Sequence, residues 1–169
     1  MEKKSTGEIV KIKLRTNYVG FLMPKPDEII EQRLTITKDH MWLSKYVFGK
    51  GFGEHERVSF NHHKINEKDG LAIISKVVNH FEPADMLSLC GGIKPLFTDV
   101  GYWELELITS DGDVHSHRGS REIVTRSPLV SISKYIRKKL NDNSLFLFDG
   151  GDERERLDGI ESEHDIYNG

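Results

Sequence analysis

Apolar and acidic side chains alternate over residues 102–109 (YWELELIT), and this alternation constrains the fold more than any other feature. A period of two residues is typical of a β-strand with one buried and one solvated face. Asp111 and Gly112 follow, and these residue types tolerate the positive φ angles of a two-residue hairpin turn. The segment therefore predicts a β-hairpin whose second strand runs from Val114 to Gly119.

The length of the turn determines the pairing of this hairpin. A two-residue loop pairs Thr109 with Val114 and, further out, Glu106 with His117. Both His115 and His117 would then lie on the glutamate-bearing face, in water. In this register, His117 would form a charge-assisted cross-strand pair with Glu106, which gives the histidine a structural role in the sheet.

A second periodicity, of three to four residues, begins after Ser127 and Pro128, which suit the first turn of a helix. It predicts an amphipathic helix packed on the sheet. The apolar run at residues 145–148 (LFLF) is typical of a strand buried on both faces. The polar face of the helix is expected to carry four cations, most of them near the end where they meet the helix dipole: Lys134, Arg137, Lys138 and Lys139.

The motifs GYWELEL, DG, HRGS, SKYIRKKL and LFLFDG follow one another over residues 101–150. Their order resembles the C-terminal half of small uncharacterised proteins from Gram-positive bacteria and their phages and mobile elements. The resemblance implies a domain type and a bacterial or phage source. It implies no activity, cofactor or site residue.

The first half of the chain predicts strands and a second helix. Runs rich in β-forming residues occur at 8–15, 18–23, 33–38, 41–48 and 57–65. The first run places Ile9, Lys11 and Lys13 on one side, and we expect it at a sheet edge, because lysines prevent pairing with other chains. Asn66 or Asp69 caps a helix that ends before Pro83.

The expected fold class is therefore α+β, with antiparallel strands and two amphipathic helices packed on the sheet. Its 169 residues and 37% hydrophobic content fit a single domain over residues 1–150. No apolar run approaches the roughly 20 residues that span a bilayer, and the start MEKKSTGE lacks the apolar segment of a signal peptide. We therefore expect a cytoplasmic protein. Its single cysteine, Cys90, rules out an intrachain disulfide and a multi-cysteine zinc site.

The charged residues are unevenly distributed along the chain. Residues 151–169 contain seven acidic residues and two arginines, a net charge of −5, which leaves +2 of the total −3 to residues 1–150. This acidic tail has few apolar residues and is expected to be flexible, although such a segment can order on a basic partner.

The string Asp113-x-His115-x-His117 suggests metal chemistry, because imidazoles two residues apart on a strand point the same way. Families that use this spacing build a large barrel and draw further ligands from downstream, where this chain has only His164.

Three other motifs suggest a catalytic or ligand-binding role, but the residues around them do not fit that role. His62, His63 and His80 could suggest an H-N-H nuclease, but adjacent strand residues face opposite ways. The glycine-rich residues 49–53 (GKGFG) precede a strand, where a phosphate-binding loop needs a helix. Neither a base nor an activating environment for Cys90 can be located, and we interpret it as a small buried thiol.

We expect a non-enzymatic cytosolic binding protein, such as an inhibitor, immunity or anti-defence factor, with a macromolecular partner and no cofactor. A protein partner is the first expectation. The alternatives are a metal-dependent hydrolase or nuclease using His115 and His117 with Asp113 or Glu106, and a nucleic-acid binding module. The candidate partner contacts are Lys134, Arg137, Lys138, Asp152, Glu153 and Glu155. Nucleic acid would instead meet Lys11, Lys13, Arg137, Lys138 and Lys139.

Overall fold

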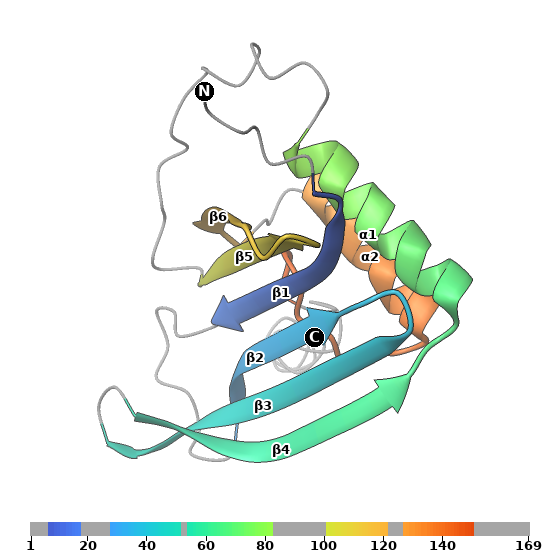
Figure 1. Cartoon of the computed structure of the whole chain (residues 1–169). Helices are drawn as coiled ribbons and strands as arrows, with labels where there is room; N and C mark the ends of the chain where they lie inside the picture. The colour runs from blue at the N-terminus through green and yellow to red at the C-terminus, as the bar shows by residue number, and fades with distance from the viewer. Residues whose placement is uncertain (1–6, 18–27, 52–53, 83–100, 122–126, 151–169) are drawn as a thin grey trace, which may run out of the picture.

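In the part of the chain that the structure describes, six antiparallel strands form one sheet, and two helices lie side by side on one of its faces (Figure 1). The structure is a computed structural model that describes residues 7–17, 28–51, 54–82, 101–121 and 127–150. The strand order is β4-β3-β2-β1-β5-β6. The predicted α+β class, with antiparallel strands and two helices, is confirmed. The elements are β1 (Ile9–Asn17), β2 (Ile29–Ile36), β3 (His40–Gly51), β4 (Glu54–Lys64), α1 (Glu67–Phe81), β5 (Tyr102–Thr109), β6 (Val114–Ser120) and α2 (Pro128–Leu140).

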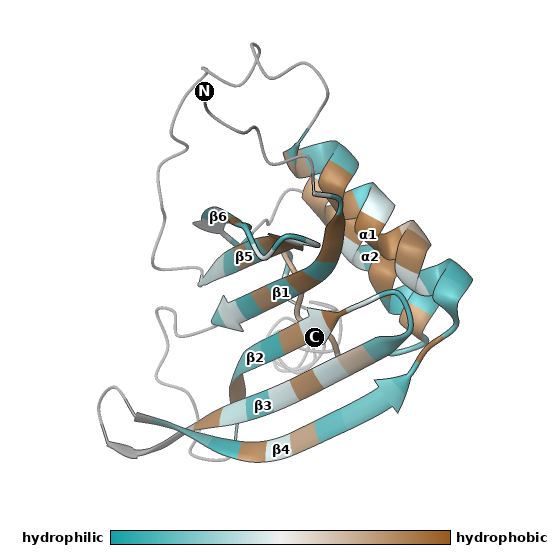
Figure 2. Ribbon diagram, in the orientation of Figure 1, coloured by the Kyte–Doolittle hydropathy of each residue, from teal (hydrophilic) through white to brown (hydrophobic). Residues whose placement is uncertain are grey.

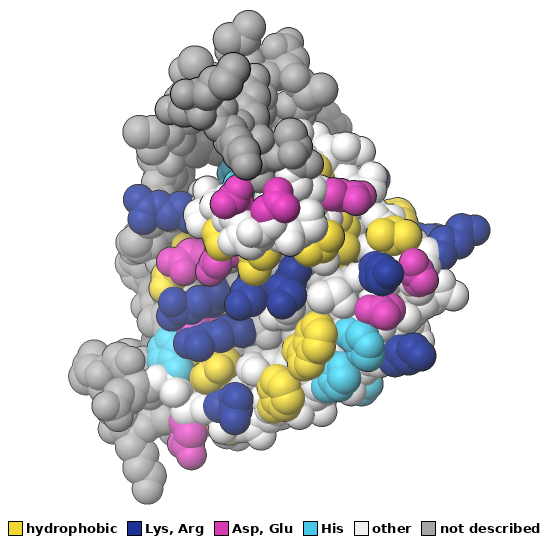
Figure 3. Space-filling view, in the orientation of Figure 1, with side chains coloured by type: hydrophobic (Ala, Val, Ile, Leu, Met, Phe, Trp, Pro, Cys, Tyr) yellow, Lys and Arg dark blue, Asp and Glu magenta, His cyan; other side chains and the backbone are white. Residues whose placement is uncertain are grey.

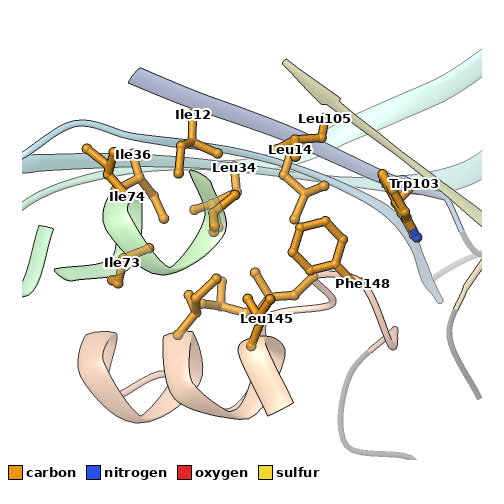
Figure 4. Packing of buried hydrophobic residues seen from close by; sticks show 14 of the residues in the cluster. Ile12, Leu14, Leu34, Ile36, Ile73, Ile74, Trp103, Leu105, Leu145 and Phe148 are labelled. Carbon is orange, nitrogen blue, oxygen red and sulfur yellow. The ribbon is translucent and has the colours of Figure 1, made fainter. Parts of the chain in front are cut away.

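The hydrophobic core lies between the sheet and the two helices. Hydrophilic and hydrophobic residues alternate along the strands (Figure 2), and the buried hydrophobic ones form one cluster with residues of α1 and α2. Leu105 and Leu107 of β5 are completely buried there. Phe148 also enters the core, beside Leu14 and Trp103 (Figure 4).

Both helices begin as their sequences predict. The side chain of Asn66 accepts a hydrogen bond from the backbone of Lys68 at 2.8 Å, so Asn66 is the N-cap of α1. Ser127 caps α2 in the same way, with Pro128 in the first turn. α2 ends at Asn141, which adopts the left-handed conformation with φ 52°.

Strand β1 lies in the middle of the sheet, between β2 and β5, so its predicted edge position is wrong. Its lysines occupy the face of the sheet opposite the helices. A β-bulge at Val10 also turns Ile9 toward the core, away from Lys11 and Lys13. Alternation along one strand indicates two faces, but it does not show which neighbours the strand will have.

Residues 145–148 form a turn-rich loop, so the strand predicted there is wrong. Leu147 has a φ of 50°, which no strand allows. The side-chain hydroxyl of Thr16 donates to the carbonyl of Leu147 at 2.6 Å, and the backbone amide of Phe148 donates to the hydroxyl of Ser133 at 3.1 Å. The all-apolar run indicated burial correctly, because Leu145, Leu147 and Phe148 are buried, but it did not specify the backbone conformation.

Some expectations lie outside the described residues: the strand at 18–23, Cys90, and the tail at 151–169 with Asp152, Glu153 and Glu155. Strands β3 and β4 pair up to Gly51 and Glu54, so a strand follows the glycine-rich residues, as the sequence predicts. Neither helix in the described part of the chain has the length and apolar content that a membrane crossing requires.

Candidate functional site

The β5–β6 hairpin places His115 and His117 on the helix side of the sheet. Leu107 pairs with His115 and Leu105 with His117, one residue away from the predicted register. The difference arises in the turn, where the backbone of Thr109 bonds that of Asp113 at 2.9 Å and leaves a three-residue loop. A slip of one residue exchanges the two faces of a strand. The predicted position of the histidines beside the glutamates is therefore wrong.

Both histidines meet the carboxylate of Glu82, which follows the last residue of α1. Nδ1 of His115 forms a hydrogen bond with Oε1 of Glu82, and Nε2 of His117 lies 3.7 Å from the same oxygen. The ring of His117 also contacts that of Phe81, with centroids 5.1 Å apart. Glu106, the predicted partner, points to the other face and lies opposite Lys13 on β1. The histidines thus connect β6 to the end of α1.

Asp113, His115 and His117 do not form the metal site that their spacing suggests. Asp113 is exposed in the hairpin turn, where its backbone amide bonds the hydroxyl of Thr109 at 3.0 Å. Among the residues that the structure describes, no group of three or more His, Cys, Asp and Glu side chains is arranged to hold a metal ion. His62 and His63 point to opposite faces of β4, as expected for adjacent strand residues, since they pair with Trp42 and Met41 respectively.

The predicted contact surface on α2 is only partly exposed. Lys134 and Lys138 are exposed, whereas Arg137 is 6% exposed. Its guanidinium group forms two hydrogen bonds with the carboxylate of Asp149 and donates from Nε to the carbonyl of Leu145 at 2.8 Å. The prediction that Arg137 lies on the solvated face is therefore wrong, because its guanidinium group is used inside the protein.

The sheet face opposite the helices, called the open face here, carries a concentration of cationic side chains. The register places Lys11, Lys13 and Arg15 of β1 on this face, and Arg33 of β2 directly opposite Arg15. Figure 3 shows Lys and Arg side chains gathered across its middle, with histidine and hydrophobic side chains beside them. In the described part of the chain, neither helix covers it (Figure 1).

A buried carboxylate organises the arginines of the open face. Glu31 of β2 is completely buried and accepts hydrogen bonds from Nε of Arg15 and Nε of Arg33, each at 3.0 Å. Nδ1 of His55 lies 3.3 Å from the same carboxylate, and Arg33 also lies over the ring of Tyr46 at 4.5 Å. These contacts hold two guanidinium groups in fixed positions while their side chains stay 38% and 51% exposed.

The charge state of Glu31 follows from the same contacts. Burial raises the pKa of Glu31, but the charges and hydrogen bonds of Arg15 and Arg33 together outweigh it, so the pKa lies below its ordinary value. Glu31 is therefore ionised at neutral pH. The carboxylate of Glu31 balances one of the two guanidinium charges, and the exposed carboxylate of Glu104 lies 3.8 Å from Arg15.

Three aromatic rings form a cluster on the open face beside the cations. Trp42 of β3 and His62 of β4 are paired across the strands, with ring centroids 4.9 Å apart and planes 6° apart. His40 stacks on both of them, and its Nδ1 shares a hydrogen bond of 2.9 Å with Nε2 of His62. Phe60 follows on the same face of β4 and is 54% exposed. The ring cluster is defined here as His40, Trp42 and His62.

Acidic residues bound the basic area on one side. Glu104 and Glu106 of β5 share the open face, and Glu104 lies 3.8 Å from Arg15. The basic area therefore covers β1 and β2, while the aromatic rings cover β3 and β4. Sequence reasoning missed this face as a unit, although the alternation of basic and apolar residues in β1 was a signal for it.

Comparison of the chain with protein-family models, with curated proteins and with solved structures gives no significant match.

Proposed function

We propose that this chain is a non-enzymatic, cytosolic binding protein that holds nucleic acid on the open face of its sheet. One observation carries the proposal: Lys11, Lys13, Arg15 and Arg33 occupy adjacent positions of one sheet face that neither helix covers. A phosphate backbone is a regular polyanion, and cations on a surface gain affinity for it by releasing its counterions.

The two types of cation suit two roles. Arg15 and Arg33 are fixed by Glu31 and expose part of each guanidinium group, which suits directional hydrogen bonds to phosphate oxygens. Lys13 is exposed and Lys11 is half-buried, and among the described residues neither lysine has a salt bridge or a side-chain hydrogen bond. The lysines are therefore able to follow a flexible phosphate backbone.

The open face favours nucleic acid over the protein partner expected from the sequence. An acidic protein would also meet the lysines, and its side chains can pack on the exposed rings. A nucleic-acid strand instead offers both parts in a regular array, with phosphates for the cations and planar bases for the rings. No observation favours a hydrolase built on Asp113, His115 and His117, because the described residues contain no group of three or more His, Cys, Asp and Glu side chains that could hold a metal ion.

Charge reversal on two surfaces tests the proposal. Labelled 20-nucleotide DNA and RNA, single-stranded and duplex, are titrated with the full chain at several salt concentrations while fluorescence anisotropy is followed. The double variant Lys11→Glu/Lys13→Glu should weaken binding more than about tenfold and reduce the slope of log K against log salt by about 2.

Lys134→Glu/Lys138→Glu is the matched control, because it makes the same change of charge on exposed residues of α2. This control should change the affinity less than about twofold. Equal losses in both double variants, or no binding by the unaltered chain, would contradict the proposal. Salt-dependent capture of an acidic protein by the open face, without nucleic-acid binding, would favour the protein partner instead.

A further inference from the structure

We infer that the nucleic acid held on the open face is single-stranded, and that its bases stack on the ring cluster and on Phe60; this inference rests on the proposed function. The rings and cations lie on one continuous surface. Lys13 pairs with Thr35 on β2, Thr35 pairs with Trp42 on β3, and Trp42 pairs with His62 on β4. One row across four strands thus runs from a cation to the rings.

The dimensions of this row suit one strand of nucleic acid. Neighbouring strands of a sheet lie about 4.8 Å apart, so the backbones of Lys13 and Trp42 are about 10 Å apart. A lysine side chain is itself several ångströms long and flexible, so its ammonium group is not confined to the position of its backbone. A strand whose phosphates follow β1 and β2 can therefore turn its bases toward β3 and β4.

The exposure of the rings supports a ligand. The other tryptophan, Trp103, is 5% exposed in the core, whereas Trp42 is half-buried on the open face and His62 is exposed. Stabilisation of the sheet by a cross-strand aromatic pair would be enough to explain why Trp42 and His62 lie together on this face. It does not explain Phe60, which leaves 54% of its surface exposed on the same face and has Arg57 over its ring at 5.4 Å.

Only a single strand offers the faces of its bases to such a surface. In a duplex, neighbouring base pairs cover those faces, and a flat sheet reaches only phosphates and groove edges. Single-stranded ligands instead combine a cationic track for the backbone with aromatic platforms for the bases. The open face contains both parts, on neighbouring strands.

The experiment compares single-stranded DNA with a duplex of the same sequence, using the full chain throughout. The probes are a 12-nucleotide single strand and its duplex. Trp42→Ala and Phe60→Ala should each weaken binding of the single strand about tenfold and leave binding of the duplex within about twofold. Phe60→Ala is included because its exposed ring contributes little to folding. Circular dichroism confirms that each variant is folded.

His63→Ala is the matched control, since His63 is exposed on the opposite face of β4. It should bind both probes as the unaltered chain does. The single strand should also quench tryptophan fluorescence in the unaltered chain and have little effect in Trp42→Phe, where Trp103 is the remaining tryptophan.

The outcomes separate the two proposals. If Phe60→Ala and Trp42→Ala leave the preference for the single strand unchanged while Lys11→Glu/Lys13→Glu still weakens binding, the stacking inference is wrong and the proposed function stands. If neither probe binds the unaltered chain, the proposed function itself is wrong. Tighter binding of the duplex than of the single strand also overturns the inference.

Discussion

Arg137 of α2 forms two hydrogen bonds with the carboxylate of Asp149 inside the protein, and its guanidinium group also donates to the carbonyls of Leu145 and Phe146. One cation thereby joins a helix to the loop that follows it. Removing one partner of a buried ion pair leaves the other charge without compensation in the interior.

Arg137→Ala should therefore lower the free energy of unfolding by about 3–5 kcal/mol, measured by urea denaturation. Its exposed neighbour offers a control, because Lys138→Ala should change the free energy by less than about 0.5 kcal/mol. Equal effects of the two substitutions would show that Arg137 does not form a stabilising buried ion pair with Asp149.

Gly70 in the first turn of α1 approaches the backbone of Lys38 so closely that a Cβ atom there would lie 2.0 Å from the carbonyl oxygen. Because that oxygen belongs to the backbone, α1 or the β2–β3 turn would have to move. Gly70→Ala should cost about 2–4 kcal/mol of stability in thermal or urea denaturation, despite the better helix propensity of alanine. Ser75→Ala, at an exposed position of the same helix, should be nearly neutral. A stabilised Gly70→Ala variant would disprove the close approach.

Glu31 should make stability depend on pH in the acid range. Its pKa is lower in the folded protein than in the unfolded chain, so it contributes stability that is fully present above the unfolded pKa of about 4.3. This contribution is lost as the pH falls through the folded pKa. Glu31→Gln should therefore be less stable than the unaltered chain at pH 7, and the difference should shrink below about pH 4.

Urea denaturation of both chains from pH 7 to pH 3 measures this difference. Glu104→Gln serves as a control, because Glu104 is exposed and meets Arg15 only at 3.8 Å. Its effect on stability should stay below about 1 kcal/mol at every pH. A gap between Glu31→Gln and the unaltered chain that does not narrow in acid would contradict the role given to the carboxylate.

The contacts of His115 and His117 lead to a prediction about metal content. Because the two histidines meet Glu82 without Asp113, the purified chain should hold less than stoichiometric zinc, manganese or nickel by elemental analysis. His115→Ala/His117→Ala should then leave the metal content unchanged. Stoichiometric metal that this double variant loses would restore the hydrolase hypothesis.

The sequence predicted the elements that depend on local signals. Asn66 and Ser127 begin their helices because a cap needs only the next few residues. The hairpin register required the hydrogen bond between Thr109 and Asp113, which residue types alone do not specify, and a slip of one residue reversed the histidines. Arg137 was misplaced because its partner, Asp149, lies 12 positions further along the chain, in the loop after the helix, and helical periodicity does not reach that far.

The sequence allowed us to recognise single residues of the candidate site but not their arrangement on one face of the sheet. Lys11 and Lys13 were recognised as cations, but the neighbours of β1 could not be known from one strand. Trp42 and His62 belong to different strands, and only the pairing of β3 with β4 brings them together. Glu31 could not be identified as the buried partner of Arg15 and Arg33, because burial of a charge depends on the complete sheet.

The loop after α2 has a consequence for the rate of folding. Its bonds to the sheet join residues far apart in the chain: Thr16 reaches Leu147 across 131 positions, and Gln32 reaches Phe146 across 114. Such contacts form only after a long loop of chain has closed, and the entropy cost of that loop closure slows folding. Folding should therefore take milliseconds to seconds, and Leu145 should acquire its protection from solvent in the final step.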